Sequence, residues 1–190
     1  FYQACKAEDI KPIIGIEAYV AARTIHDRDP AKDKARYHLI LLSMNNTGYH
    51  NLMRLSTIAN LEGMYYKPRI DHNLLEQYNE GLIVLSACLG GEIGEKLKVD
   101  DYEGAKEIAR WYKKVFGDRY YLEVQDHVDM PEQIEMNKGI FKLGKELDIP
   151  CVVTSDAHYV KIDDQEAHEI LLCVGTGAFL ADEDRMTLAD

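Results

Sequence analysis

Residues 150–158 read Pro-Cys-Val-Val-Thr-Ser-Asp-Ala-His, an apolar run that ends in a carboxylate and an imidazole two residues apart. The run itself, Pro150–Ser155, has the length and composition of a buried strand. Near-continuous apolar strands are typical of parallel sheets that are covered on both faces. Four other stretches have a similar pattern and are also expected to be strands: Pro12–Val20, Tyr37–Met44, Gly81–Leu89 and Tyr120–Gln125.

Helical spacing of apolar residues occupies most of the intervals between these strands. The expected helices are Asn51–Leu61, Tyr102–Phe116, Ile134–Leu147 and Gln165–Val174, and Phe1–Ala7 resembles the end of another. The polar stretch 21–36 is expected to be an exposed excursion. Alternating strands and helices predict an α/β fold, and a closed or nearly closed β/α barrel fits best. Because five strands are too few to close a barrel, we expect further strands before Phe1.

Composition limits the functions that the chain can have. It has 190 residues, 46% of them hydrophobic, and a net charge of −11. Nucleic-acid binding domains usually carry a basic surface, so a broad DNA-binding face is not expected, although a small metal site for phosphates remains possible. No apolar run approaches the roughly 20 residues that span a bilayer. Four scattered cysteines without a CxxC pair suggest a reducing, cytoplasmic setting.

In β/α barrels, catalytic groups follow the carboxyl ends of strands, so the polar residues at these positions are candidates. Asp156 and His158 follow the last strand, and Cys88 ends the strand before Gly90 and Gly91. Carboxylate, imidazole and thiolate groups together suit a Zn²⁺, Mn²⁺ or Fe site that hydrolyses phosphoesters. Each residue has a structural alternative: a capped turn for Asp156 and His158, and a small core residue for Cys88.

Five further residues are weaker candidates for the same site. Glu17 lies inside an apolar strand, where it is either a metal ligand or half of a buried ion pair. His38 opens the next strand as a ligand or a core histidine. His127 ends the stretch YYLEVQDH at 120–127, where a surface turn is the alternative. Lys67, together with its near neighbour Arg69, could bind phosphate oxygens or form a loop salt bridge to Asp71 or another acid.

The motifs taken together resemble a known family. IKPIIGIEAYVA at 10–21, YYKPRID at 65–71, GLIVLSACLGGEI at 81–93 and TSDAHYV at 154–160 are similar to the PHP domain of bacterial DNA polymerase III alpha subunits. The similarity covers nearly the whole chain, so 1–190 is interpreted as part of one PHP domain. The palm, fingers and thumb of a polymerase are expected beyond residue 190.

This resemblance implies a distorted, TIM-like barrel that holds up to three divalent metal ions (Zn, Mn or Fe). It implies that Glu17, His38, Cys88, Asp156 and His158 are metal ligands and that the domain has 3′→5′ exonuclease potential. The family's His-x-His and Thr-Asp-His-Gly motifs are absent from these residues. Some members keep the domain only as a scaffold, so a structural role is the alternative. The implied partners are primer-template DNA and replisome subunits such as the sliding clamp, in the bacterial cytoplasm and without a membrane.

Overall fold

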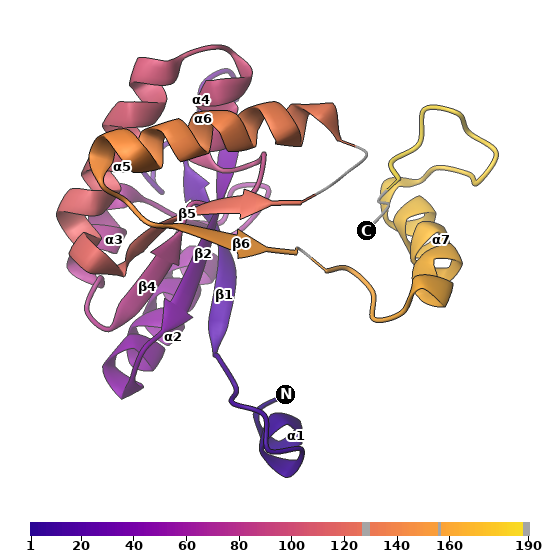
Figure 1. Ribbon diagram of the computed structural model, residues 1–190, viewed down its shortest axis with the longest axis horizontal. Helices are drawn as coiled ribbons and strands as arrows, with labels where there is room; N and C mark the ends of the chain where they lie inside the picture. Colours follow the sequence, from indigo (N-terminus) through magenta and orange to yellow (C-terminus); the bar gives the residue numbers. More distant parts are fainter. Residues whose placement is uncertain (127–129, 156, 188–190) are drawn as a thin grey trace.

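A six-stranded sheet forms the centre of the computed structural model, in the spatial order β3-β1-β2-β4-β5-β6 (Figure 1). The structure describes residues 1–126, 130–155 and 157–187. The strands are β1 (Gly15–Ala21), β2 (Arg36–Ser43), β3 (Arg69–Ile70), β4 (Leu82–Leu85), β5 (Tyr120–Gln125) and β6 (Cys151–Thr154). Because β3 and β6 are the two edges, the described strands form an open sheet. The predicted α/β class with an incomplete barrel is therefore confirmed.

Strand direction differs from the expectation of an all-parallel sheet. β1 and β3, β4 and β5, and β5 and β6 are parallel, but β2 is antiparallel to both β1 and β4. Antiparallel neighbours need no crossover helix, and the segment 22–35 between β1 and β2 contains none. An apolar run indicates that a strand is buried but not whether it runs parallel or antiparallel to its neighbours. The expected parallel direction was therefore wrong for β2.

Seven α-helices connect or flank these strands in the described residues. They are α1 (Tyr2–Ala7), α2 (Asn46–Leu61), α3 (His72–Gln77), α4 (Glu92–Lys98), α5 (Tyr102–Phe116), α6 (Pro131–Leu147) and α7 (Gln165–Thr176), with 3₁₀ turns at Gly117–Arg119 and Ile162–Asp164. α2 begins earlier than predicted because the Asn45 side chain accepts a hydrogen bond from Gly48 N–H and caps the helix. α3 and α4 were not predicted, since helices of two turns or fewer show little periodicity.

The two faces of β1 and β2 have different environments. Ala18, Val20, Leu39 and Leu41 are buried in the core, where residues of α2 such as Leu55 join them. The alternate residues of the same strands point to the other face, because side chains alternate along a strand. On that face Glu17 keeps 52% of its side chain exposed and His38 keeps 33%. Coverage of these strands on both faces is therefore not observed, and polar groups have access to solvent.

The segment 22–35 was expected to be exposed, but several contacts fix it. Arg23 and Asp33 form a bidentate ion pair with distances of 2.7 and 2.6 Å. Asp33 and Ile25 are buried, with 1% and 3% of their surface exposed. Asp71, the N-cap of α3, also accepts the Ile25 N–H at 2.9 Å. The excursion is thus an ordered flap on the β3 side of the sheet.

Both terminal helices stand apart from the sheet in Figure 1. α1 has no buried residue, and the only buried residue of α7 is Cys173. Across the described part of the chain, no helix combines the length and apolar character required to cross a membrane.

Candidate metal centre

Three of the predicted ligands meet on the open face of the sheet. His38 Nδ1 lies 2.7 Å from Glu17 Oε1 and 3.5 Å from Cys88 Sγ. Glu17 comes from β1, His38 from β2, and Cys88 from the turn after β4, so residues up to 71 positions apart in the chain converge. A carboxylate, an imidazole and a thiol are thus in contact, and their role as metal ligands stays a prediction.

Local backbone geometry explains how Cys88 reaches His38. Ala87 has φ 62°, a left-handed conformation that is costly for a residue with a Cβ, and it turns the chain away from the direction of β4. Gly90 O then accepts the His38 N–H at 2.9 Å. A Cβ on Gly91 would lie 2.3 Å from Ser86 O, so only glycine fits there. The Gly pair therefore lets the turn fold back against β2.

Contacts within the cluster shift the pKa values of His38 and Glu17. Hydrogen bonds with Cys88 and then with Glu17 raise the pKa of His38 to about 10, against the opposing effect of burial. The hydrogen bond from His38 is the largest influence on Glu17 and lowers the pKa of its carboxyl. Gly90 N–H donates to Cys88 Sγ at 3.4 Å and helps to fix the position of the sulfur. The His38 imidazole is the centre of this hydrogen-bonded group.

His158, in the segment after β6, lies close enough to this cluster to interact with Glu17. Its charge contributes to the lowered pKa of Glu17, and its ring centre is 5.5 Å from that of His168 in α7. Asp156 and His127 lie outside the described residues. The structure thus brings together Glu17, His38 and Cys88, with His158 within electrostatic range, and the placement of the other two stays a prediction.

The donor atoms have the chemistry of a borderline divalent metal site, because such ions accept imidazole nitrogen, thiolate sulfur and carboxylate oxygen. Within the cluster, His38 Nδ1 contacts both Glu17 and Cys88. No three His, Cys, Asp or Glu side chains of the described ranges are arranged to hold a metal ion. Metal binding would therefore require His38 to lose its proton and these side chains to separate.

The two basic candidates of the 65–71 motif have different environments. Arg69 is fully buried and donates to the backbone carbonyls of Gly63, Ile25, Asp27 and Asp33. This is neither the phosphate contact nor the acid pairing that the sequence suggested, and the guanidinium has no access to a substrate. We therefore leave Arg69 out of the proposed site. Lys67 is exposed, with its Nζ 6.0 Å from the centre of the Tyr19 ring.

A further carboxylate at the strand ends escaped the sequence analysis. Glu123 of β5 is 4% exposed, and its Oε1 accepts a hydrogen bond from Thr154 Oγ1 of β6 at 2.5 Å. Its backbone N–H donates to Ser86 Oγ at 2.8 Å, just before the Cys88 turn. Glu123 therefore links the ends of β4, β5 and β6. The signal that singled out Glu17, a carboxylate within an apolar strand, is also present here.

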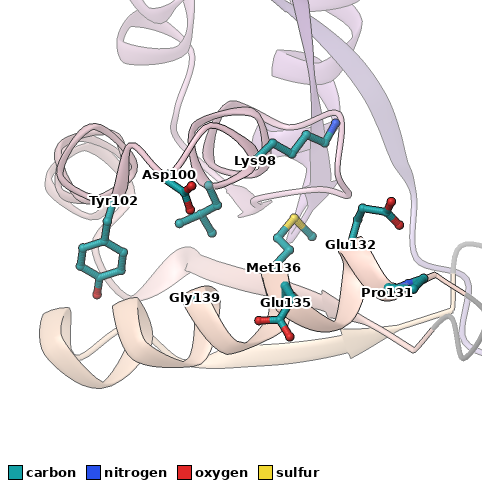
Figure 2. Close-up of a pocket in the computed structure, with 9 residues that line it drawn as sticks. Lys98, Asp100, Tyr102, Pro131, Glu132, Glu135, Met136 and Gly139 are labelled. Carbon is teal, nitrogen blue, oxygen red and sulfur yellow. The ribbon is translucent and has the colours of Figure 1, made fainter.

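Two cavities differ in whether they adjoin the candidate metal centre. One of about 360 Å³ is lined by His38 and by Tyr19, Lys34, Ala35, Arg36, Tyr37 and Glu95. Another, of about 520 Å³, lies between α6 and the α4–α5 connection (Figure 2). Its lining includes Asp100, Glu132 and Glu135 and none of the predicted site residues. The carboxylates that line it disfavour an anionic ligand. The 360 Å³ cavity is therefore the one of these two that adjoins the candidate metal centre, through His38.

Comparison with known proteins identifies the family. The model of the PHP domain matches residues 1–127. DNA polymerase III subunit alpha of Borreliella burgdorferi is 45% identical over 190 residues, covering 99% of this chain and 16% of that protein. The Treponema pallidum and Thermus aquaticus subunits are 47% and 42% identical, covering 98% and 97% of this chain. The chain spans 16% and 15% of the lengths of those two relatives.

The family match covers the cluster described above, since it includes β1, β2 and the turn that carries Cys88. It also covers the 65–71 motif that carries Lys67 and Arg69. On this match, the chain belongs to the PHP domain family.

Proposed function

We propose that the chain is the PHP domain of a bacterial DNA polymerase III alpha subunit, and that the domain removes nucleotides from a DNA 3′ end with the help of divalent metal ions. The observation that carries the proposal is the meeting of Glu17, His38 and Cys88 at one point on the open face. The similarity to DNA polymerase III alpha subunits over nearly the whole chain supports it. The proposal places the protein in the cytoplasm, acting on primer-template DNA with replisome partners such as the sliding clamp.

The proposed ligands are Glu17, His38, Cys88, Asp156 and His158, and the proposed ions are Zn, Mn or Fe. A divalent ion held there would supply Lewis-acid activation of water and would neutralise charge on the phosphate. Glu17 orients the His38 ring through the 2.7 Å contact. Gly90 N–H donates to Cys88 Sγ and holds the sulfur beside His38. The open face of the sheet lets a DNA 3′ end approach the cluster, because more than half of the Glu17 side chain is exposed.

The experiment measures metal content and nuclease activity in the full-length protein. Mass spectrometry should find two to three metal equivalents, and the Asp156→Asn/His158→Ala variant should lose most of them. Asp156→Asn should abolish removal of a mispaired 3′ nucleotide and preserve polymerisation. His50→Ala, which changes an exposed histidine of α2, is the control and should retain both metal and nuclease activity. Nuclease activity retained by Asp156→Asn would exclude this assignment.

A second candidate function is a non-catalytic scaffold that supports the polymerase and its replisome contacts. The observation in its favour is that Glu17 and Cys88 both contact His38 Nδ1, so these polar groups already partner one another. Absence of metal from both the parent and the Asp156→Asn/His158→Ala protein, together with normal polymerisation, would favour this candidate.

A further inference from the structure

Basic side chains gather around the Tyr19 ring next to the candidate metal centre. The Arg36 guanidinium carbon is 5.9 Å from the ring centre, and Lys67 Nζ is 6.0 Å from it. The rings of Tyr19 and His38 are 5.3 Å apart, edge to face. Lys34 lines the same cavity of about 360 Å³ as Tyr19, Arg36 and His38. Three cations and one aromatic ring thus adjoin the group formed by Glu17, His38 and Cys88.

Strand register explains this placement. Tyr19 follows Glu17 by two residues and Arg36 precedes His38 by two, so all four occupy the same face of β1 and β2. Tyr19 lies directly opposite His38 in the antiparallel ladder. Lys67 comes from the other side, because β3 pairs with β1 and sets Arg69 beside Tyr19. The cationic group is therefore built into the same sheet as the proposed ligands.

The charges of these cations are available to an external anion. Lys34, Arg36 and Lys67 form no ion pair with a carboxylate in the parts of the chain that the structure describes. The acid that lines the same cavity, Glu95, is paired with Lys98 at 2.7 Å. The protein as a whole carries a net charge of −11, so a local cluster of unneutralised cations contrasts with the rest of its surface. Such a cluster attracts phosphate groups.

We propose that Arg36, Lys67 and Lys34, arranged around Tyr19, bind a backbone phosphate of a single-stranded DNA 3′ end and guide it to the adjacent centre. This inference rests on the proposed nuclease function and adds the residues that hold the strand. The aromatic ring has two roles. It holds the cations through cation–π attraction, and it offers an edge or a face to the terminal base. The positive charge of Arg36 would hold the phosphate next to the ring.

The test detects the strand independently of hydrolysis. Full-length Asp156→Asn protein is irradiated with a single-stranded oligonucleotide that carries 5-iododeoxyuridine at its 3′ end, and cross-linked peptides are identified by mass spectrometry. We expect a cross-link at Tyr19 and a yield at least fivefold lower when Arg36→Gln and Lys67→Gln are added. Arg36→Lys, which keeps the charge, should retain most of the yield. Circular dichroism confirms that each variant is folded.

Lys142→Gln is the matched control, since Lys142 Nζ lies 4.0 Å from the centre of the Tyr102 ring. Tyr102 lines the separate cavity of about 520 Å³. This change should leave the Tyr19 cross-link unaltered. Absence of a Tyr19 cross-link, or a yield unchanged by the Arg36→Gln/Lys67→Gln pair, would overturn the subsite even if the wild-type protein is an active nuclease. A Tyr19 cross-link that depends on both cations would support the subsite even if the wild-type protein hydrolyses nothing.

Discussion

Arg69 Nη2 donates hydrogen bonds to the carbonyl oxygens of Ile25 and Asp27, at 3.0 and 3.1 Å. Its Nε donates to Gly63 O at 3.2 Å, so one buried guanidinium connects the 22–35 flap to the loop before β3. A charged donor buried among backbone carbonyls replaces the water that these groups would otherwise bind. The arginine that the sequence offered as a phosphate ligand is instead the residue that orders the flap beside the site.

Arg69→Met should therefore destabilise the protein strongly. It leaves several buried carbonyls unpaired, and hydrogen bonds to charged groups are worth about 1.5–3 kcal/mol each, so we expect a loss of about 3 kcal/mol or more. Lys67→Met, two residues away and exposed, should change the free energy of unfolding by no more than about 0.5 kcal/mol. Urea unfolding followed by fluorescence of Trp111, the single tryptophan, measures both. Equal stabilities would contradict a structural role for Arg69.

The Asp71 carboxylate joins the same flap to α3. Oδ1 accepts the Leu74 N–H at 3.0 Å and Oδ2 accepts the Ile25 N–H at 2.9 Å. Asp71→Ala removes both acceptors and should cost about 2 kcal/mol, more than a simple helix cap. Asp71→Asn keeps one acceptor oxygen and should cost less. Comparing the urea midpoints of the two variants separates the cap from the flap contact, and a cost of Asp71→Ala equal to that of Asp71→Asn would show that only one contact matters.

The close approach of Gly48 and Gly81 fixes α2 against the start of β4. A Cβ on Gly48 would lie 1.9 Å from Gly81 O, and the backbone cannot yield without moving the helix. Gly48→Ala should therefore lower the free energy of unfolding by about 1–3 kcal/mol, as overpacking typically does. The loss is measured as a lower thermal unfolding midpoint. Gly175→Ala is the control in a helix, since nothing lies within 4 Å of its added Cβ. That variant should be neutral or more stable, because alanine favours helices.

The comparison of sequence and structure shows which signals were informative. Strands with a strong apolar run were located correctly, and β5 has the predicted bounds. The two-residue strand β3 was missed because Arg69 and Ile70 carry no detectable pattern by themselves. Glu17, His38 and Cys88 were each candidates from the sequence, but their mutual contact depends on the pairing of β1 with β2 and β4 with β2, which the sequence did not predict. The role of Arg69 was not predicted either, because buried hydrogen bonds to carbonyls 36 to 44 residues away leave no local trace.

Most of the cations around Tyr19 were also missed in the sequence. Arg36 and Tyr19 were not singled out, although each lies two residues from a predicted ligand and so shares its face. The missing information was the antiparallel register of β1 and β2, which places Tyr19 opposite His38. Strand direction could not be inferred from burial alone. The sequence therefore predicted candidate ligands but not the residues that lie beside them.

The ion pair between Arg23 and Asp33 makes the flap sensitive to acid. The Arg23 guanidinium is the largest cause that lowers the pKa of the Asp33 carboxyl, and the Asp29 N–H acts in the same direction. A carboxyl with a lowered folded-state pKa stabilises the native state above its unfolded value, about 3.9 for aspartate. This contribution is lost as pH falls through the lower folded-state pKa, when the native carboxyl takes up its proton.

Asp33→Asn isolates this contribution, because the other acidic groups remain the same in both proteins. The wild-type protein should be more stable than Asp33→Asn at pH 7. The difference should stay constant down to about pH 4 and then shrink. Urea unfolding of both proteins between pH 2.5 and 7 measures it, within the range in which both still fold. A stability difference that is independent of pH across this range would mean that Asp33 acts through hydrogen-bond geometry, with no contribution from its charge.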